Sequence, residues 1–430
     1  MKNQSSDATL TGFAALIGLD WGHGAHAIAL EISGANTETS TLEHSAENLH
    51  QWLDQLEKRC GGRPVAVAIE ASKGAAVYAL LERPWITVYP IHPATSTRTR
   101  AAFRPSGAKD DTPDALVLLS LLQHHRDRLR PLQLDDEATR TLARLVEARR
   151  KAVDRRTLLS NQLQSTLRDY FPQALELVGD NLAAPLALDF LERWPRLTDV
   201  QAARNATLKS FYQRHNVRRP ELIESRVQRI RSARLLTRDA AVTEVAVRTV
   251  RLLVAELRVL QEHIAAFETA IAQAFAAHPE KNLFRELPGA GAVLAPRLLV
   301  AFGTLRDRFA DAGAMQRYFG VAPVTEKSGG RVWVHWRWNA PVFVRQTLVE
   351  WAGQTVVYCP WAKAYYEQQR GKRVGHWAIL RALAFKWLRI LWRCWQKSEA
   401  YEEEKYLRQL EQRRSPIAAL ARQFAKQMAS

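Results

Sequence analysis

Short apolar runs alternate with amphipathic stretches through the first 130 residues. Four mostly apolar runs predict strands, over residues 14–20, 25–32, 64–70 and 86–91. Three stretches with helical spacing predict helices, over residues 46–59, 75–81 and 113–126. Short strands that alternate with helices indicate an α/β sheet domain.

The pattern changes to long helices from about residue 137. One run keeps an unbroken alternation of three and four residues, at Val250, Leu253, Leu257, Leu260, Ile264, Phe267, Ile271 and Ala274. An earlier run has related spacing, with Arg149 and Arg156 as interruptions, at Leu142, Leu145, Ala152, Leu159 and Leu163. Such spacing predicts a coiled-coil seam, in which the two runs pair with each other, with another subunit, or with both.

These patterns divide the chain into five parts. We expect a flexible N-terminus (1–12), an α/β domain (13–130), a coiled-coil arm (137–278), a small helical C-terminal domain (280–396) and a charged tail (397–430). Within the C-terminal domain one apolar helical stripe is expected in the core, at Leu380, Ala384, Trp387, Leu391 and Trp395.

The overall charge favours a polyanionic partner. The 430 residues carry a net charge of +17, with a pI of about 10.1. Residues 204–238, inside the arm, hold ten basic and two acidic residues, which favours phosphate contact over a merely solvated helical face.

Nothing in the chain predicts a membrane protein or a secreted one. No stretch of roughly 18 uncharged apolar residues occurs, and the polar N-terminus lacks the features of a secretion signal. The three cysteines are scattered and predict neither a disulfide framework nor a zinc site. We therefore expect a cytoplasmic protein that associates with the nucleoid.

Four carboxylates stand at the ends of the predicted elements of the α/β domain: Asp20, Glu70, Asp111 and Asp114. Each has an ordinary alternative role, as a turn cap, a helix N-cap or a solvated strand end. Together they would need a cation to stay ionised, and their oxygens favour Mg²⁺, with Mn²⁺ as the alternative. Such a site can activate water or a hydroxyl to cut a phosphodiester.

Two further motifs lie in the C-terminal domain. The Leu-Pro-Gly289-Ala-Gly291 segment and its apolar continuation resemble a helix-hairpin-helix, in which backbone N–H groups face a DNA phosphate. An ordinary turn between helices is the alternative. Ser328 precedes two glycines in a basic loop and could approach a phosphate closely, but its chemistry alone indicates only a loop serine.

In their order along the chain these motifs resemble the DEDD transposases of insertion-sequence family 110. The matching residues are Gly-Leu-Asp20, Ala-Ile-Glu70, Lys-Asp-Asp111-Thr-Pro-Asp114, the Gly289 segment, Gly-Val-Ala-Pro to Ser328, and Arg345-Gln-Thr-Leu. The resemblance covers about residues 14–396. Asp110 departs from the pattern, since it adds a fifth carboxylate beside Asp111.

The resemblance implies an RNase H-like (RuvC-type) domain, a coiled-coil arm and a small helical transposase domain. It implies magnesium on the acidic quartet and a Ser328 hydroxyl that attacks DNA to form a phosphoserine intermediate. It further implies a structured bridge RNA that selects donor and target DNA. Since Ser328 is far along the chain from the quartet, a homo-oligomer (dimer or tetramer) with composite sites is expected.

Three alternatives stay open. A RuvC-like, structure-selective nuclease would use the quartet without the serine. An actin-like ATPase or sugar kinase could share the Gly18-Leu-Asp20-Trp-Gly22 segment, but we find no second glycine-rich phosphate loop in the sequence. A non-catalytic nucleic-acid-binding protein would need neither the carboxylates nor the serine.

Overall fold

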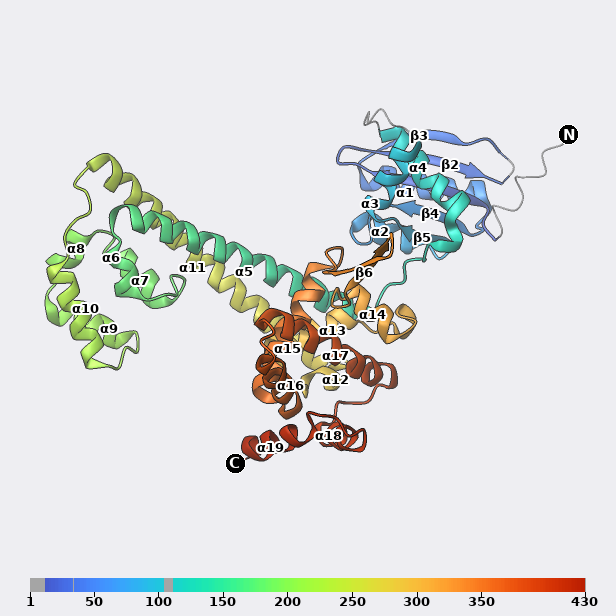
Figure 1. Ribbon diagram of the computed structural model, residues 1–430. Helices are drawn as coiled ribbons and strands as arrows, with labels where there is room; N and C mark the ends of the chain where they lie inside the picture. The colour runs from blue at the N-terminus through green and yellow to red at the C-terminus, as the bar shows by residue number, and fades with distance from the viewer. Residues whose placement is uncertain (1–11, 34, 104–110, 430) are drawn as a thin grey trace. The chain divides into compact units, whose positions relative to one another are not determined.

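The chain folds into two compact units, Met1–Leu134 and Asp135–Ser430 (Figure 1). The computed structural model describes residues 12–33, 35–103 and 111–429. Of the N-terminal segment expected to be flexible, all but Gly12 lies outside the described residues, as does Asp110.

The first unit contains a five-stranded mixed sheet in the order β3-β2-β1-β4-β5. Its strands are β1 (Ala15–Trp21), β2 (Ala25–Ile32), β3 (Glu38–Glu43), β4 (Val65–Ile69) and β5 (Ile86–Pro90). The first three strands are antiparallel, whereas β1, β4 and β5 run parallel. This confirms the predicted α/β class. The polar, exposed edge strand β3 was not predicted, because Glu-Thr-Ser-Thr-Leu-Glu has no apolar run.

Helices cover both faces of this sheet. One core joins the sheet to α1 (Ala46–Cys60) and α2 (Ala75–Leu81). The opposite core joins it to α4 (Asp111–His125), beside which lies α3 (Pro93–Phe103). A 3₁₀ turn, η1 (Arg126–Arg128), follows α4. Burial on both faces explains why β1 and β4 read as continuous apolar runs rather than alternating ones.

The helix α4 packs against the backbone of β1 with no room for a side chain at Gly18. A Cβ atom there would lie 1.9 Å from the Ala115 carbonyl oxygen and 2.6 Å from the Leu119 nitrogen. Both obstacles are backbone atoms of one helix, so the helix as a whole would have to move. This contact fixes the height of α4 over the sheet.

In the second unit, two long helices form an antiparallel pair, α5 (Glu137–Tyr170) and α11 (Ala240–Ala277) (Figure 1). Their direction follows from ion pairs of Arg149 with Glu268 and of Arg155 with Glu256. Buried residues of the predicted runs include Leu142, Leu159, Leu163, Val250, Leu253, Leu257, Ile264 and Ile271. The pairing of the two runs with each other is confirmed; pairing with another subunit stays a prediction.

Short helices close over one end of this pair and share its core: α6 (Gln173–Val178), α7 (Pro185–Arg193), α8 (Leu197–Ala202), α9 (Asn205–Arg214) and α10 (Pro220–Ser232). The basic segment 204–238 thus forms helices. Ion pairs with acidic side chains of the same unit neutralise part of its charge: Lys209 pairs with Glu224 and Arg229 with Glu176, both at 2.6 Å.

The remaining elements form a tryptophan-rich helical module. They are α12 (Lys281–Arg285), α13 (Gly291–Phe302), η2 (Arg306–Arg308), α14 (Ala312–Tyr318), β6 (Val324–Ser328), β7 (Arg331–His335), α15 (Val342–Tyr358), α16 (Pro360–Gly371), α17 (His376–Lys397), α18 (Glu403–Gln412) and α19 (Ala418–Ala429). The stripe predicted on α17 is buried as expected. The charged tail also contributes to this core, through Leu407, Ile417 and Ala421. Among the described residues, no helix is long and apolar enough to cross a membrane.

Asp136 caps the N-terminus of α5 and ties it to the end of α13. Its carboxylate accepts hydrogen bonds from the Thr139 backbone N–H at 2.9 Å and from the Thr139 and Thr304 hydroxyls, both at 2.7 Å. Burial alone would raise the pKa of Asp136, but these hydrogen bonds outweigh it and lower the pKa from 3.8 to about 2.

Replacing Gly18 by alanine should destabilise the first unit by about 3 kcal/mol, the upper part of the usual range for overpacking. Gly24→Ala is the matched control, since nothing lies within 4 Å of a Cβ built there. Urea unfolding, followed by hydrogen exchange of the β1 amides, measures both. Equal stability of the two variants would show that α4 adjusts freely.

The Asp136 cap predicts a specific pH dependence. Because the folded-state pKa lies below the unfolded one, the carboxylate stabilises the fold fully above about pH 4 and loses that effect as pH falls towards 2. Asp136→Asn keeps a capping side chain without the charge. The free energy of unfolding of the parent, relative to this variant, should therefore fall between pH 4 and pH 2 in urea titrations. Parallel pH curves would contradict the assignment.

Candidate active site

Asp20 and Glu70 lie at the C-terminal ends of two neighbouring strands in the middle of the sheet; this end of the sheet is called the acidic edge below. Asp20 lies near the end of β1, and Glu70 directly follows β4. These strands are parallel neighbours with Leu19 opposite Ile69, so the next residue of each chain lies at the same edge. Since side chains alternate along a strand, both carboxylates point to the face that α4 covers, the face of Leu16, Ala66 and Ala68.

Asp114 approaches this edge from the first turn of α4. It is buried, and its Oδ1 lies 2.6 Å from Nε of Arg100, which comes from α3. Its neighbour Ala115 makes the backbone contact over Gly18, two residues before Asp20 in β1. The close approach of helix and strand therefore brings the third carboxylate to the same face and edge.

The helix α3 supplies two side chains to the acidic edge that sequence reasoning missed. The buried Ser96 hydroxyl donates to Glu70 Oε1 and also lies 2.9 Å from the Pro93 carbonyl oxygen. One turn further on, Arg100 pairs with Asp114. The sequence of α3, Pro-Ala-Thr-Ser-Thr-Arg-Thr-Arg-Ala-Ala-Phe, has no apolar period. The only available signal was the spacing of four between Ser96 and Arg100.

The donor chemistry of this edge suits a hard divalent cation, because its ligands are all carboxylate oxygens. Within the described residues, however, no group of three or more His, Cys, Asp or Glu side chains is arranged to hold a metal ion. The Asp111 side chain falls outside the described part of the chain. The guanidinium of Arg100 is one positive charge beside Asp114.

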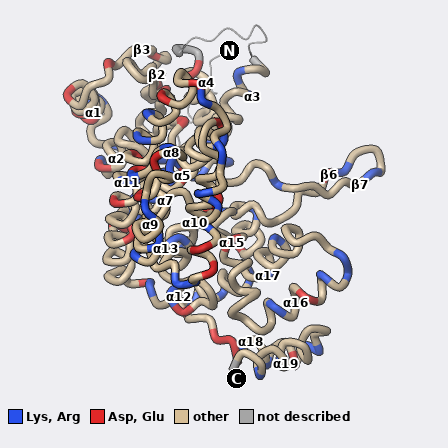
Figure 2. Tube along the Cα trace, turned by 90° about the vertical axis from the view of Figure 1, so that its left-hand side faces the viewer, with Lys and Arg blue, Asp and Glu red and all other residues tan. Residues whose placement is uncertain are grey.

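Ser328 lies at the tip of a β-hairpin rather than in the flexible loop expected from the sequence. It ends β6 and pairs with Arg331 of β7 across Gly329 and Gly330, whose φ angles are 54° and 78°. Two successive positive φ angles are those of a type I′ turn, which favours glycine at both positions. The Ser328 side chain is exposed, and Figure 2 shows basic residues at this end of the hairpin.

Indoles on the hairpin and in the segment that follows it were not identified from the sequence. Trp333 is 48% exposed and Trp338 is 78% exposed. Trp336, between them, packs under the guanidinium groups of Arg345 at 5.4 Å and Arg381 at 4.6 Å. Aromatic faces among cations are typical of surfaces that stack nucleobases.

Gly289 and Gly291 lie at the turn between α12 and α13, a position that fits both a helix-hairpin-helix and an ordinary turn. Their φ angles are 69° and 53°, and α13 begins at Gly291 without a side-chain cap. A Cβ at Gly289 would lie 2.9 Å from the Gln354 and Tyr358 side chains, so this position is closed to larger residues. The indole of Trp351 fixes the turn by donating to the Pro288 carbonyl oxygen at 3.0 Å.

Two family profiles match the parts of the chain that contain these candidate site residues. The DEDD transposase profile of the IS110 group matches residues 17–172, which include the acidic edge. The profile described as transposase IS116/IS110/IS902 family matches residues 281–367, which include the Gly289 turn and the Ser328 hairpin. The two matches together span more than half of the chain. The chain belongs to the IS110/IS116 family of transposases.

Two individual relatives align with almost the whole transposase, and a third aligns with about half of it. The mini-circle protein of IS117 from Streptomyces coelicolor, named as a transposase, is 28% identical over 90% of this chain and 95% of its own length. The 43.6 kDa protein of insertion element IS110 from the same species is 26% identical over 90% and 95%. The y4uE protein of Sinorhizobium fredii, also named as a transposase, is 31% identical over 47% and 57%.

Membership of this family makes the protein a DNA transposase, an enzyme whose substrate is DNA. DEDD transposase domains are RNase H-like as a class, which agrees with the mixed sheet of the first unit. The ATPase, sugar kinase and non-catalytic alternatives therefore have no support from the comparisons.

Replacing Arg100 by alanine should cost about 2 kcal/mol of stability, because the mostly buried Asp114 carboxylate would lose its ion pair with Arg100. Fully buried pairs lose 3–5 kcal/mol or so in such experiments, but these side chains are 11% and 23% exposed. Arg98→Ala, an exposed position on the same helix, is the matched control. Urea unfolding measures both, and Asp114→Asn should recover part of the loss. If Arg98 and Arg100 variants were equally stable, the pair would have no structural role.

Proposed function

We propose that this transposase cuts and rejoins the DNA strands of an insertion sequence with a metal-bound acidic quartet and a serine nucleophile. The observation that carries the proposal is the convergence of Asp20, Glu70 and Asp114 on one face and edge of the sheet. A RuvC-type metal site of this kind would be completed by Asp111, one turn of α4 before Asp114.

The carboxylates Asp20, Glu70, Asp111 and Asp114 would hold Mg²⁺, or Mn²⁺ in its place. When bound, the cation polarises the scissile phosphate and neutralises developing charge. Ser96 orients Glu70 through its hydroxyl. Arg100 holds the Asp114 carboxylate in position through their ion pair.

Ser328 supplies the attacking oxygen. Its Oγ forms a bond to phosphorus while one bridging oxygen of the phosphodiester leaves, and the proton lost by the serine ends on that leaving oxygen. One ester replaces another, so the phosphoserine link retains the energy needed to reseal a strand. The exposed position of Ser328 at a hairpin tip, flanked by Lys327 and Arg331, suits approach to a polyanion.

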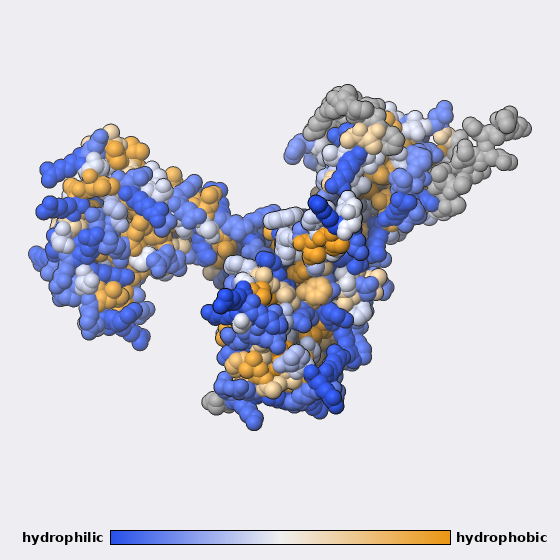
Figure 3. All heavy atoms as spheres, viewed as in Figure 1, coloured by the Kyte–Doolittle hydropathy of each residue, from blue (hydrophilic) through white to orange (hydrophobic). Residues whose placement is uncertain are grey.

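A complete site requires both compact units, since the quartet lies in Met1–Leu134 and Ser328 in Asp135–Ser430. They come from one chain or from two. A homo-oligomer, a dimer or tetramer, is favoured by an exposed apolar stripe on α11 with a spacing of seven: Val245 is 64% exposed, Leu252 60% and Val259 54%. Apolar patches of this kind interrupt the hydrophilic surface in Figure 3.

A structured bridge RNA selects the DNA sites in this proposal. The excess of positive charge, +17 over the chain, suits a large polyanionic partner. Several arginines of segment 204–238 are exposed and suit phosphate contact: Arg214, Arg218, Arg219, Arg234 and Arg238. The RNA itself is inferred from the family resemblance.

Ser328→Ala should abolish a covalent protein–DNA adduct. The parent protein, incubated with Mg²⁺, labelled DNA carrying the element's ends and the structured RNA transcribed beside it, should give an adduct that survives denaturing electrophoresis. Removal of the nucleophile should lower adduct formation by at least about 10³-fold. Asp20→Asn, or omission of Mg²⁺, should have a similar effect because the phosphate is then not polarised.

Thr325→Ala is the matched control, since it removes an exposed hydroxyl from the same strand. It should leave adduct formation within about twofold of the parent, as most surface substitutions do. Cleavage by Ser328→Ala at the parent rate, with free DNA ends and no adduct in either protein, would overturn the serine mechanism. That result would instead favour the structure-selective nuclease.

A further inference from the structure

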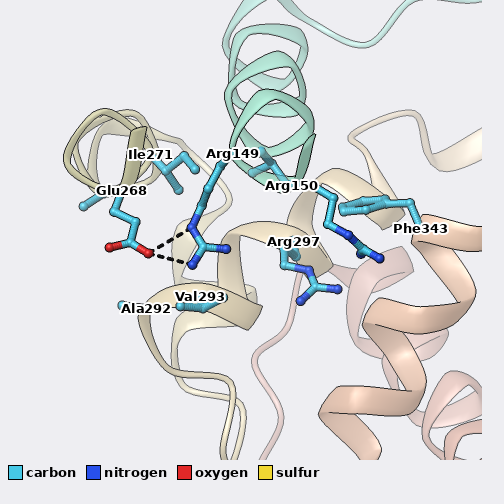
Figure 4. A pocket seen from close by; sticks show the side chains of 10 residues that line it. Arg149, Arg150, Glu268, Ile271, Ala292, Val293, Arg297 and Phe343 are labelled. Carbon is cyan, nitrogen blue, oxygen red and sulfur yellow. Dashed lines mark hydrogen bonds and ion pairs between the residues drawn. The ribbon is translucent and has the colours of Figure 1, made fainter. Parts of the chain in front are cut away.

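A cavity of about 170 Å³ lies in the second unit, where the long helices meet the C-terminal module (Figure 4). Its walls come from α5, α11, α13 and α15, which are far apart in sequence. Three of the lining side chains are arginines: Arg149, Arg150 and Arg297. An engineered apolar cavity of about 150 Å³ holds one benzene molecule, so this space accommodates one small group.

The arginines are held in place by neighbouring polar side chains. Arg149 donates to Glu268 Oε1 at 2.6 Å and 3.0 Å, and Arg297 donates to Glu350 Oε2 at 2.7 Å. Arg150 donates to the side-chain amide oxygen of Gln346, Oε1, and is also paired with Asp154. These contacts leave donors available: the buried Nη2 of Arg297 has no hydrogen-bond partner among the described residues. An orphaned buried donor is costly unless a ligand accepts from it.

The three guanidinium groups lie near one another, and each is also paired with a carboxylate: Arg149 with Glu268, Arg150 with Asp154 and Arg297 with Glu350. Burial lowers the pKa of Arg297; Glu350 opposes this effect, and the positive charges of Arg150 and Arg149 lower the pKa further. The Arg297 side chain is only 12% exposed, so water screens the repulsion poorly. An anion beside Arg297 would accept from Nη2, the donor that the pair with Glu350 leaves without a partner.

A helix N-terminus faces the same cavity. Ala292 and Val293, in the first turn of the twelve-residue α13, line it, and no side chain caps this helix. The first N–H groups of a helix have no carbonyl partner within it and carry partial positive charge. Backbone N–H groups and arginine forks together are the donors that proteins use for phosphate.

We propose that this cavity binds one phosphate group of a nucleic-acid backbone, with Arg149 and Arg150 from the arm and Arg297 and the N-terminus of α13 from the C-terminal module. The apolar rim, which includes Phe343 and Val293, suits contact with the adjoining sugar. The inference rests on the proposed function, since it needs a nucleic-acid ligand. It adds a site to which the arm itself contributes.

Arg150→Gln is the informative variant, because it removes a charge from the cavity and leaves the Arg149–Glu268 and Arg297–Glu350 pairs intact. It breaks only the pair of Arg150 with Asp154, whose side chain is 64% exposed. Arg155→Gln is the matched control: it removes the same charge from α5 at a 62% exposed position outside the cavity. Binding of the full-length protein to a labelled DNA duplex and to a labelled structured RNA is measured at several salt concentrations, with EDTA present.

Loss of one phosphate contact should weaken binding by Arg150→Gln about 10-fold and reduce the slope of log Kd against log salt concentration by about 1. Arg155→Gln should keep the parent slope. If Arg150→Gln changes this slope with DNA only, with RNA only, or with both, the result identifies which nucleic acid supplies the phosphate. Each of these three results supports the site. Equal slopes for the two variants with both probes would overturn the proposal.

A second measurement needs no variant. Hydrogen exchange of the Gly291, Ala292 and Val293 amides in the parent protein should slow when the nucleic acid that showed the slope is added. Unchanged exchange would overturn the proposal even if Arg150→Gln folded poorly. Because EDTA prevents strand cleavage, these results are independent of Ser328 chemistry. A failed adduct experiment and a failed cavity experiment are therefore distinguishable.

Discussion

The contact between α4 and β1 at Gly18 sets the geometry on which the candidate chemistry depends. Carboxylates repel each other, so a chain gains nothing by gathering three of them unless the backbone leaves no alternative. Here the backbone of α4 rests on the backbone of β1, with the Ala115 carbonyl over Gly18. Asp114 is the residue before Ala115 on α4, and Asp20 comes two residues after Gly18 on β1. Packing of two rigid elements thus determines where the charges lie, and Arg100 and Ser96 compensate for the cost.

A tight packing contact at a glycine also positions polar groups in the second unit. Gly289 packs under Gln354 and Tyr358, which leaves the first turn of α13 facing the arginine-lined cavity. At the other end of α13, Asp135 and Asp136 bind the Thr304 region and join it to the start of α5. The long helix α5 therefore lies beside α13 in two places: at the C-terminal end of α13, through Asp135 and Asp136, and at its first turn, where both helices line the cavity. A ligand in the cavity would meet a preorganised site.

The sequence predicted elements whose apolar period is strong and missed those that lack one. The strands at 14–20 and 64–70, and the paired runs of α5 and α11, follow directly from burial on one or both faces. The polar edge strand β3 and the threonine- and arginine-rich α3 have no such pattern, because their places are set by neighbours distant in sequence. In the candidate site, Asp20, Glu70 and Asp114 were indicated by their positions at the ends of predicted strands and at the start of a predicted helix. The partners Ser96 and Arg100, and the arginine cluster around Arg297, depend on tertiary contacts that no local spacing encodes.

The hairpin that carries Ser328 has almost no core of its own. Of its two strands only Val324 is even partly shielded from water, and an isolated two-stranded ribbon is marginally stable. The orientation of the serine hydroxyl is then not a property of the free chain; it is fixed only when something covers the ribbon and its indoles. If Ser328 is the nucleophile, as proposed, its hydroxyl would be positioned for attack only in the assembled complex. Random DNA that meets the free protein would then not be cut.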